Sequence, residues 1–90
     1  MTKKKQRRVH PAVRAERHVH SALIGLATWW EKQQIPVSAA DLAAHFGKGE
    51  DWTLRCLIAA ERTGHCLRDA DGLWHMTADG WDRVGGCKLE

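Results

Sequence analysis

Hydrophobic residues recur every three or four positions between Ala12 and Gln33, a period that predicts an amphipathic helix with one buried face. The predicted buried face consists of Val19, Ala22, Leu23, Leu26 and Trp30. Pro11 suits the first turn of this helix, where its missing N–H is no loss. The sequence Ile35-Pro36-Val37 should end the helix in a short strand or an extended link, because proline disfavours helical geometry in the residue before it.

Two shorter helices should follow. Ser38 begins the first, because its hydroxyl can cap backbone N–H groups and Asp41 stands in the position of a capping-box acid. Gly47 ends that helix where a left-handed residue is needed. Its apolar face consists of Leu42, Ala43 and Phe46. The next helix is predicted from Asp51, as its N-cap, to about Thr63. Gly64 stops it, and Leu54, Leu57 and Ile58 anchor its buried side.

The last third of the chain predicts a β-hairpin and a final short helix. Two extended runs, His65–Arg68 and Leu73–Thr77, flank the turn sequence Asp69-Ala70-Asp71-Gly72. Asp-Gly between apolar segments is a strong hairpin signal. Thr77 can cap the short helix that follows, and Trp81 should dock that helix on the core.

This order of elements is that of a winged helix-turn-helix domain. Three segments carry the resemblance. Residues 36–43 resemble the opening of the first helix-turn-helix helix in bacterial regulators. Leu57, Ala60, Glu61 and Gly64 resemble the end of their recognition helix, and residues 76–80 resemble the Leu-Thr-x-x-Gly signature after the wing. The resemblance covers about residues 15–84 and implies an α+β, mostly helical winged helix-turn-helix fold with a three-helix core, a short hairpin wing and a short C-terminal helix.

Size and composition suit one domain of this kind. The 90 residues are 43% hydrophobic, which is typical of a globular chain. We expect a disordered basic tail over residues 1–11, the winged-helix domain over 12–84, and a flexible end over 85–90 in which Leu89-Glu90 is a tag remnant. No leader sequence or apolar run of about 20 residues is evident, and the three cysteines are irregularly spaced. We therefore expect a reducing, cytoplasmic location.

The net charge of +3 is unevenly distributed along the chain. Residues 1–35 carry eight basic and two acidic side chains, whereas residues 36–88 carry six basic and eight acidic ones. The basic character therefore belongs to the tail and the first helix. Acidic side chains at Glu50 and Asp51, and at Asp69 and Asp71 in the wing, oppose contact with a phosphate backbone at those two places.

The winged-helix resemblance implies duplex DNA as the partner, with the third helix in the major groove and the wing near the backbone. The predicted DNA-binding residues are Lys48, Trp52, Thr53, Arg55, Ala59 and Arg62 around the third helix, Arg68 and Trp74 in the wing, and Lys3, Lys4, Lys5, Arg7 and Arg8 in the tail. Arg55 falls where many such regulators carry an arginine, which can read a guanine edge. We therefore expect a small transcriptional regulator.

Five tryptophans in 90 residues keep a second hypothesis open. They either fill a small core or form an anchor for another protein. The alternative function is therefore a protein-binding module that uses the Trp52 side of the third helix or Trp74 of the wing. Trp30 and Trp81 are expected to be core residues. Two of these rings exposed together would form the kind of aromatic anchor that protein interfaces favour.

The sequence offers no metal centre and no catalytic centre. Cys56, His65, Cys66, His75 and Cys87 lie in the second half of the chain, but their spacing matches no zinc motif. Cys66 should instead replace a buried apolar residue in the first wing strand. No nucleophile elbow or phosphate-binding loop is present. We therefore expect no cofactor and no enzymatic activity.

Overall fold

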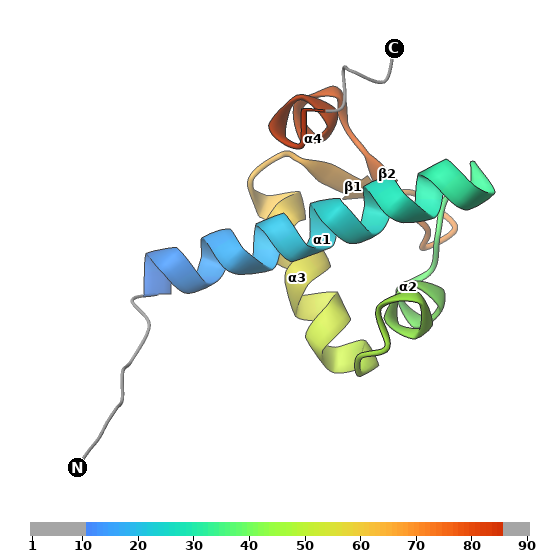
Figure 1. Cartoon of the computed structure of the whole chain (residues 1–90), viewed down its shortest axis with the longest axis horizontal. Helices are drawn as coiled ribbons and strands as arrows, with labels where there is room; N and C mark the ends of the chain where they lie inside the picture. The colour runs from blue at the N-terminus through green and yellow to red at the C-terminus, as the bar shows by residue number, and fades with distance from the viewer. Residues whose placement is uncertain (1–10, 86–90) are drawn as a thin grey trace.

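A computed structural model describes residues 11–85, and within them the chain forms four helices and one antiparallel hairpin. The elements are α1 (Pro11–Gln33), α2 (Ala39–Phe46), α3 (Glu50–Arg62), β1 (Cys66–Arg68), β2 (Trp74–Met76) and α4 (Ala78–Arg83). Helix α1 crosses α3, with α2 and α4 on opposite sides of α1 (Figure 1). This is the predicted order in an α+β, mostly helical chain. Residues 1–10 of the predicted tail and residues 86–90 lie outside the described part, and Pro11, predicted as the last tail residue, begins α1.

The predicted stripe of α1 is buried except at its end. Val19, Ala22, Leu23 and Leu26 are at most 4% exposed, whereas Trp30 is 41% exposed, so its predicted burial is wrong. Trp29 packs against the core instead, and its indole Nε1 donates a hydrogen bond to the Ile35 carbonyl oxygen at 2.9 Å. Trp29 therefore takes the inward position that was predicted for Trp30, because the chain after α1 turns back beneath this end of the helix. No helix in residues 11–85 is long and apolar enough to cross a membrane.

The predicted ends of α2 are confirmed, and the predicted start of α3 is wrong by two residues. The Ser38 hydroxyl accepts a hydrogen bond from the Asp41 N–H at 3.1 Å, and Gly47 is left-handed with φ 73°. The N-cap of α3 is Gly49 and not Asp51. Asp51 therefore lies in the first helical turn, where a carboxylate interacts favourably with the helix dipole.

The hairpin is fixed to the helices through Trp74. Strands β1 and β2 pair with Cys66 opposite Met76 and Arg68 opposite Trp74. Val37, in the predicted extended link after α1, forms an antiparallel bridge with Trp74, with N–H···O distances of 3.3 and 2.8 Å. Cys66 and Trp74 are each 2% exposed, as expected of the inward face of the strands. The Trp74 side chain is thus part of the core.

The core lies where α1 packs on α3 and where the hairpin closes against both helices. It consists of Val19, Ala22, Leu23, Leu26, Val37, Leu42, Cys56, Leu57, Ala60, Cys66 and Trp74. Leu54 and Ile58, expected on the buried side of α3, are partly buried against it. Each helix thus buries one stripe and leaves its other face open to solvent.

Helix α4 approaches the start of β1 closely at a glycine. The predicted Thr77 cap is confirmed, since its hydroxyl accepts a hydrogen bond from the Gly80 N–H at 3.1 Å. Gly80 is buried, and a Cβ on it would lie 2.1 Å from the His65 carbonyl oxygen. That oxygen belongs to the backbone and cannot turn aside, so any larger side chain must push α4 away from the hairpin.

Gly80→Ala should therefore destabilise the protein by about 1–3 kcal/mol, as overpacking of a closed contact does. Helix propensity alone predicts the opposite sign, about 1 kcal/mol in favour of alanine. Urea unfolding followed by circular dichroism measures the difference. Asp82→Ala, on an exposed position of the same helix, serves as the control and should stay within about 0.5 kcal/mol. A Gly80→Ala variant as stable as the parent would contradict the close approach.

Candidate nucleic-acid interface

A groove lined by basic side chains runs between the N-terminal half of α1 and the outer face of α3. Its lining residues are Arg14, Ala15 and His18 of α1 with Arg55, Ile58, Ala59 and Arg62 of α3. An adjoining hollow shares Arg14 and His18 and adds Arg17, Ser21 and Trp52. The two hollows together place four arginines and one histidine around one depression on the surface.

Helix periodicity explains why these side chains meet. Arg55 and Arg62 are seven residues apart, so they project from the same side of α3, two turns from each other. Arg14, Arg17 and His18 follow a three- and four-residue spacing away from the buried stripe of α1. Because the two helices pack through their buried stripes, the residues beside those stripes flank the line of contact. The groove is therefore a direct consequence of the α1–α3 packing.

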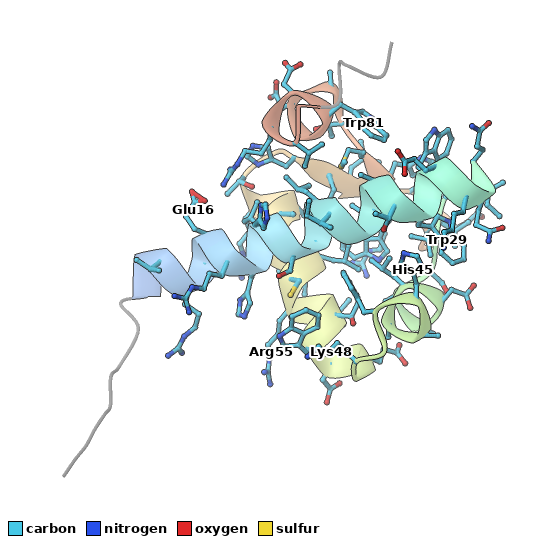
Figure 2. All side chains as sticks on the ribbon, in the orientation of Figure 1. Glu16, Trp29, His45, Lys48, Arg55 and Trp81 are labelled. Carbon is cyan, nitrogen blue, oxygen red and sulfur yellow. The ribbon has the colours of Figure 1, made fainter. Side chains whose placement is uncertain are left out.

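The groove carries positive charge without neutralising carboxylates. Neither hollow has an Asp or Glu in its lining. In the described part of the chain the ion pairs are Glu16 with Arg83 and Asp69 with His75, so all four groove arginines are without a carboxylate partner there. Glu16 lies on the α4 side of α1, opposite Arg55 (Figure 2). A surface of this kind concentrates anions by its electrostatic field.

Lys48 and Trp52 extend the basic surface at the start of α3. The ammonium nitrogen of Lys48 lies 5.6 Å from the centre of the Trp52 ring, within reach of a cation–π contact. Trp52 is half-buried and meets the Phe46 ring edge-on at 5.4 Å. Trp52 therefore lines the groove and contacts Lys48, while exposed Glu50 and Asp51 limit the positive charge at this end.

The hairpin turn has the opposite electrostatic character. The Oδ1 atom of Asp69 accepts hydrogen bonds from the Asp71 and Leu73 N–H groups at 2.9 and 3.0 Å, and Oδ2 lies 2.7 Å from His75 Nε2. The hydrogen bond with His75 and those from the backbone hold the pKa of Asp69 below its usual value. Asp69 therefore remains a carboxylate, and exposed Asp71 adds a second negative charge to the turn.

The structure brings some of the predicted DNA-binding residues to the surface and removes others. Lys48, Arg55, Arg62 and Arg68 are exposed, and Trp52 and Ala59 are half-buried. Thr53 is fully buried with its hydroxyl bonded to the Gly49 carbonyl oxygen at 3.0 Å, and Trp74 is 2% exposed. These two side chains lie in the interior, so the surface position that the prediction requires of them is wrong. Lys3, Lys4, Lys5, Arg7 and Arg8 lie outside the described residues.

Arg68 has a different role from the one predicted, and two arginines of α1 line the groove although neither was predicted as a site residue. The Arg68 guanidinium lies 5.2 Å from the centre of the Trp74 ring, so it covers a core residue as well as facing solvent. Arg14 and Arg17 were not among the predicted site residues. Their positions beside the buried stripe of α1 were visible in the sequence, but their meeting with α3 depends on the packing of the two helices.

The exposed tryptophan surface lies away from α3, at the C-terminal end of α1. A cavity of about 120 Å³ there is lined by Leu26, Trp29, Trp30, Ile35, Val37, Trp74, His75, Met76 and Trp81. Trp30 and Ile35 on its rim are 41% and 54% exposed. Trp81 is half-buried, and so docks α4 only in part. The exposed part of this apolar surface is supplied by Trp30 and Ile35, whereas Trp74 is buried at 2% exposure.

The described cysteines are structural. Cys56 and Cys66 are buried, and burial raises the pKa of the two thiols to about 11 and about 12. Both thiols stay protonated at neutral pH and are poor nucleophiles. The predicted burial of Cys66 is confirmed, and its thiol donates to the Leu57 carbonyl oxygen at 3.4 Å. Within residues 11–85, no three His, Cys, Asp or Glu side chains gather as metal ligands would; Cys87 falls outside this range.

Known proteins provide no further guide to the site. No protein-family model, curated protein or solved structure matches the chain. Any function must therefore be argued from the charges, exposure and spacing of the chain's own residues. The basic groove between α1 and α3 is the feature whose chemistry points most directly to a class of ligand, namely a polyanion.

Proposed function

We propose that the chain is a winged helix-turn-helix protein that binds duplex DNA and acts as a small transcriptional regulator. The sequence of three helices, hairpin and short helix supports this fold, as does the bridge between Val37 and Trp74. The observation that carries the DNA-binding proposal is the arginine groove along α3, which has no carboxylate in its lining. Affinity for DNA comes largely from such arginines, because each phosphate that they neutralise releases counterions.

In this proposal α3 enters the major groove with Arg55 and Arg62 facing the DNA. The guanidinium of Arg55 is exposed and in the first half of the helix, where recognition helices contact base edges. A bidentate contact with a guanine edge discriminates against other bases by about 1–3 kcal/mol. Arg62, two turns further along, is the natural partner for a phosphate.

The basic segment before α1 adds affinity that does not depend on base sequence. Lys3, Lys4, Lys5, Arg7 and Arg8 precede Pro11 directly in the chain. Short basic segments of this type follow phosphates or enter the minor groove beside a recognition helix. Five cations that precede α1 in the sequence would contribute chiefly to the salt dependence of binding.

The test is a salt titration of the full chain against a labelled duplex of mixed sequence, about two helical turns long. Fluorescence anisotropy between about 50 and 200 mM salt should show an affinity that falls steeply as salt rises. Removal of residues 2–10 should reduce the magnitude of the slope of log K against log salt by up to about 4.5, since each of the five lost phosphate contacts accounts for about 0.9.

A chain shortened by residues 86–90 is the matched control and should keep the full slope. A full chain that does not bind the duplex even at the lowest salt concentration would refute the proposal. A slope that is unchanged by removal of residues 2–10 would leave DNA binding by α3 but assign the basic segment no part in it.

The exposed tryptophan surface supports a second candidate function, self-association through the end of α1. Trp30 and Ile35 flank an apolar cavity and are both largely exposed, and two copies related by a two-fold axis would cover these surfaces mutually. Sedimentation equilibrium should then show a dimer that Trp30→Glu converts to monomer without loss of thermal stability, because Trp30 is not a core residue. A parent chain that stays monomeric at all concentrations reached would reject this candidate.

A further inference from the structure

We infer that the DNA backbone crosses the N-terminal half of α1, where Arg14 and Arg17 bind phosphates together with Arg62 while Arg55 faces the base edges, and that the hairpin turn lies clear of the DNA. The inference rests on the proposed function and refines it. It replaces contact through α3 and the wing by contact through α3 and α1, and it adds two phosphate-binding residues to the site.

The hollows between α1 and α3 bring four arginines to one depression and no carboxylate. On α1, Arg14 and Arg17 are about 4.5 Å apart along the helix axis, and on α3, Arg55 and Arg62 are about 10.5 Å apart. The positive charge thus forms an extended track and not a single point, which suits a ligand with regularly repeated negative charges such as a nucleic-acid strand.

Arginines on facing sides of a groove repel one another. Within the described residues, no carboxylate lines these hollows or lies within ion-pair distance of their arginines. Glu16, one turn or less from both α1 arginines, turns to the other side of the helix and pairs with Arg83 of α4. Glu16, the acid nearest in sequence to these two arginines, is therefore held on the α4 side of α1. A phosphate placed between the two helices would relieve the repulsion.

The hairpin offers little to a phosphate. Its turn displays the carboxylates of Asp69 and Asp71, and Asp69 is fixed in place by three hydrogen bonds. The one arginine of the hairpin, Arg68, lies over Trp74, which is itself buried. Approach of a DNA strand to this turn would set negative charge against negative charge.

The experiment compares two double variants of the full chain that remove the same charge from different places. Arg14→Gln with Arg17→Gln alters the α1 side of the groove, and Lys32→Gln with Arg68→Gln alters the far end of α1 and the hairpin. Both are measured by anisotropy with the same labelled duplex across the same salt range, after circular dichroism shows that each variant melts as the parent does. We expect the first pair to lower the slope of log K against log salt by about 2, and the second to leave it unchanged.

Each other outcome has a distinct meaning. Equal losses of slope in both variants would show a general effect of net charge and overturn the α1 track. If the parent binds and the Arg14 and Arg17 variant has the same slope of log K against log salt, phosphate binding by α1 is also overturned. The proposed function is then left intact. A parent chain that fails to bind duplex DNA would remove both proposals together. Equally tight binding of a duplex RNA would contradict the assignment of DNA as the ligand.

Discussion

The packing of α1 across α3 is the contact on which the other features of the molecule depend. Leu23 and Leu26 of α1 meet Cys56, Leu57 and Ala60 of α3 in a core in which all five residues are at most 4% exposed. In a chain of this size the buried surface is small, so this one interface supplies a large share of the stabilising apolar contact. Because it is formed by one stripe of each helix, it also decides which side chains stand beside it. The arginine groove is the exposed margin of the same interface.

Trp74 connects this helical core to the hairpin and thereby determines how the hairpin can function. Its backbone pairs with both Val37 and Arg68, and its ring is buried beneath the Arg68 guanidinium. The largest aromatic ring of the hairpin is consequently a structural element and not a contact for DNA or protein. What remains exposed at the turn is acidic, so a hairpin in the position of a wing need not act as a DNA-binding wing. The positive surface lies between α1 and α3, and no hairpin residue lines it.

Local signals in the sequence predicted most of the secondary structure, because each depends on a few neighbouring residues. The Ser38 and Thr77 caps and the left-handed Gly47 are of this kind. The errors arose where two adjacent residues have similar side chains and tertiary packing decides which of them is buried. Either Trp29 or Trp30 could have turned inward, and the choice depends on Ile35, whose carbonyl oxygen accepts the Trp29 N–H.

The residues of the candidate site were predicted only in part, because some of them are set by helix period and others by tertiary packing. The exposed positions of Arg55 and Arg62 follow from the period of α3, but the burial of Thr53 does not follow from its polarity. A threonine satisfies its hydroxyl by bonding to the preceding turn, as Thr53 does with Gly49, and can then be buried among apolar residues. Arg14 belongs to the site only because α1 packs beside α3. The apolar stripe of one helix does not specify which other helix it packs against, so the sequence could not predict this residue.

The central claim is that a nucleic acid lies on the α1–α3 groove of this fold. A two-dimensional ¹H–¹⁵N NMR titration of the chain with duplex DNA tests it most directly, because it locates the contact surface residue by residue. The account predicts the largest shift changes in α3 and in the N-terminal half of α1, around Arg14 and Arg17, with small changes in residues 66–76. The largest changes in the hairpin turn, or around Trp30 and Ile35, would contradict it.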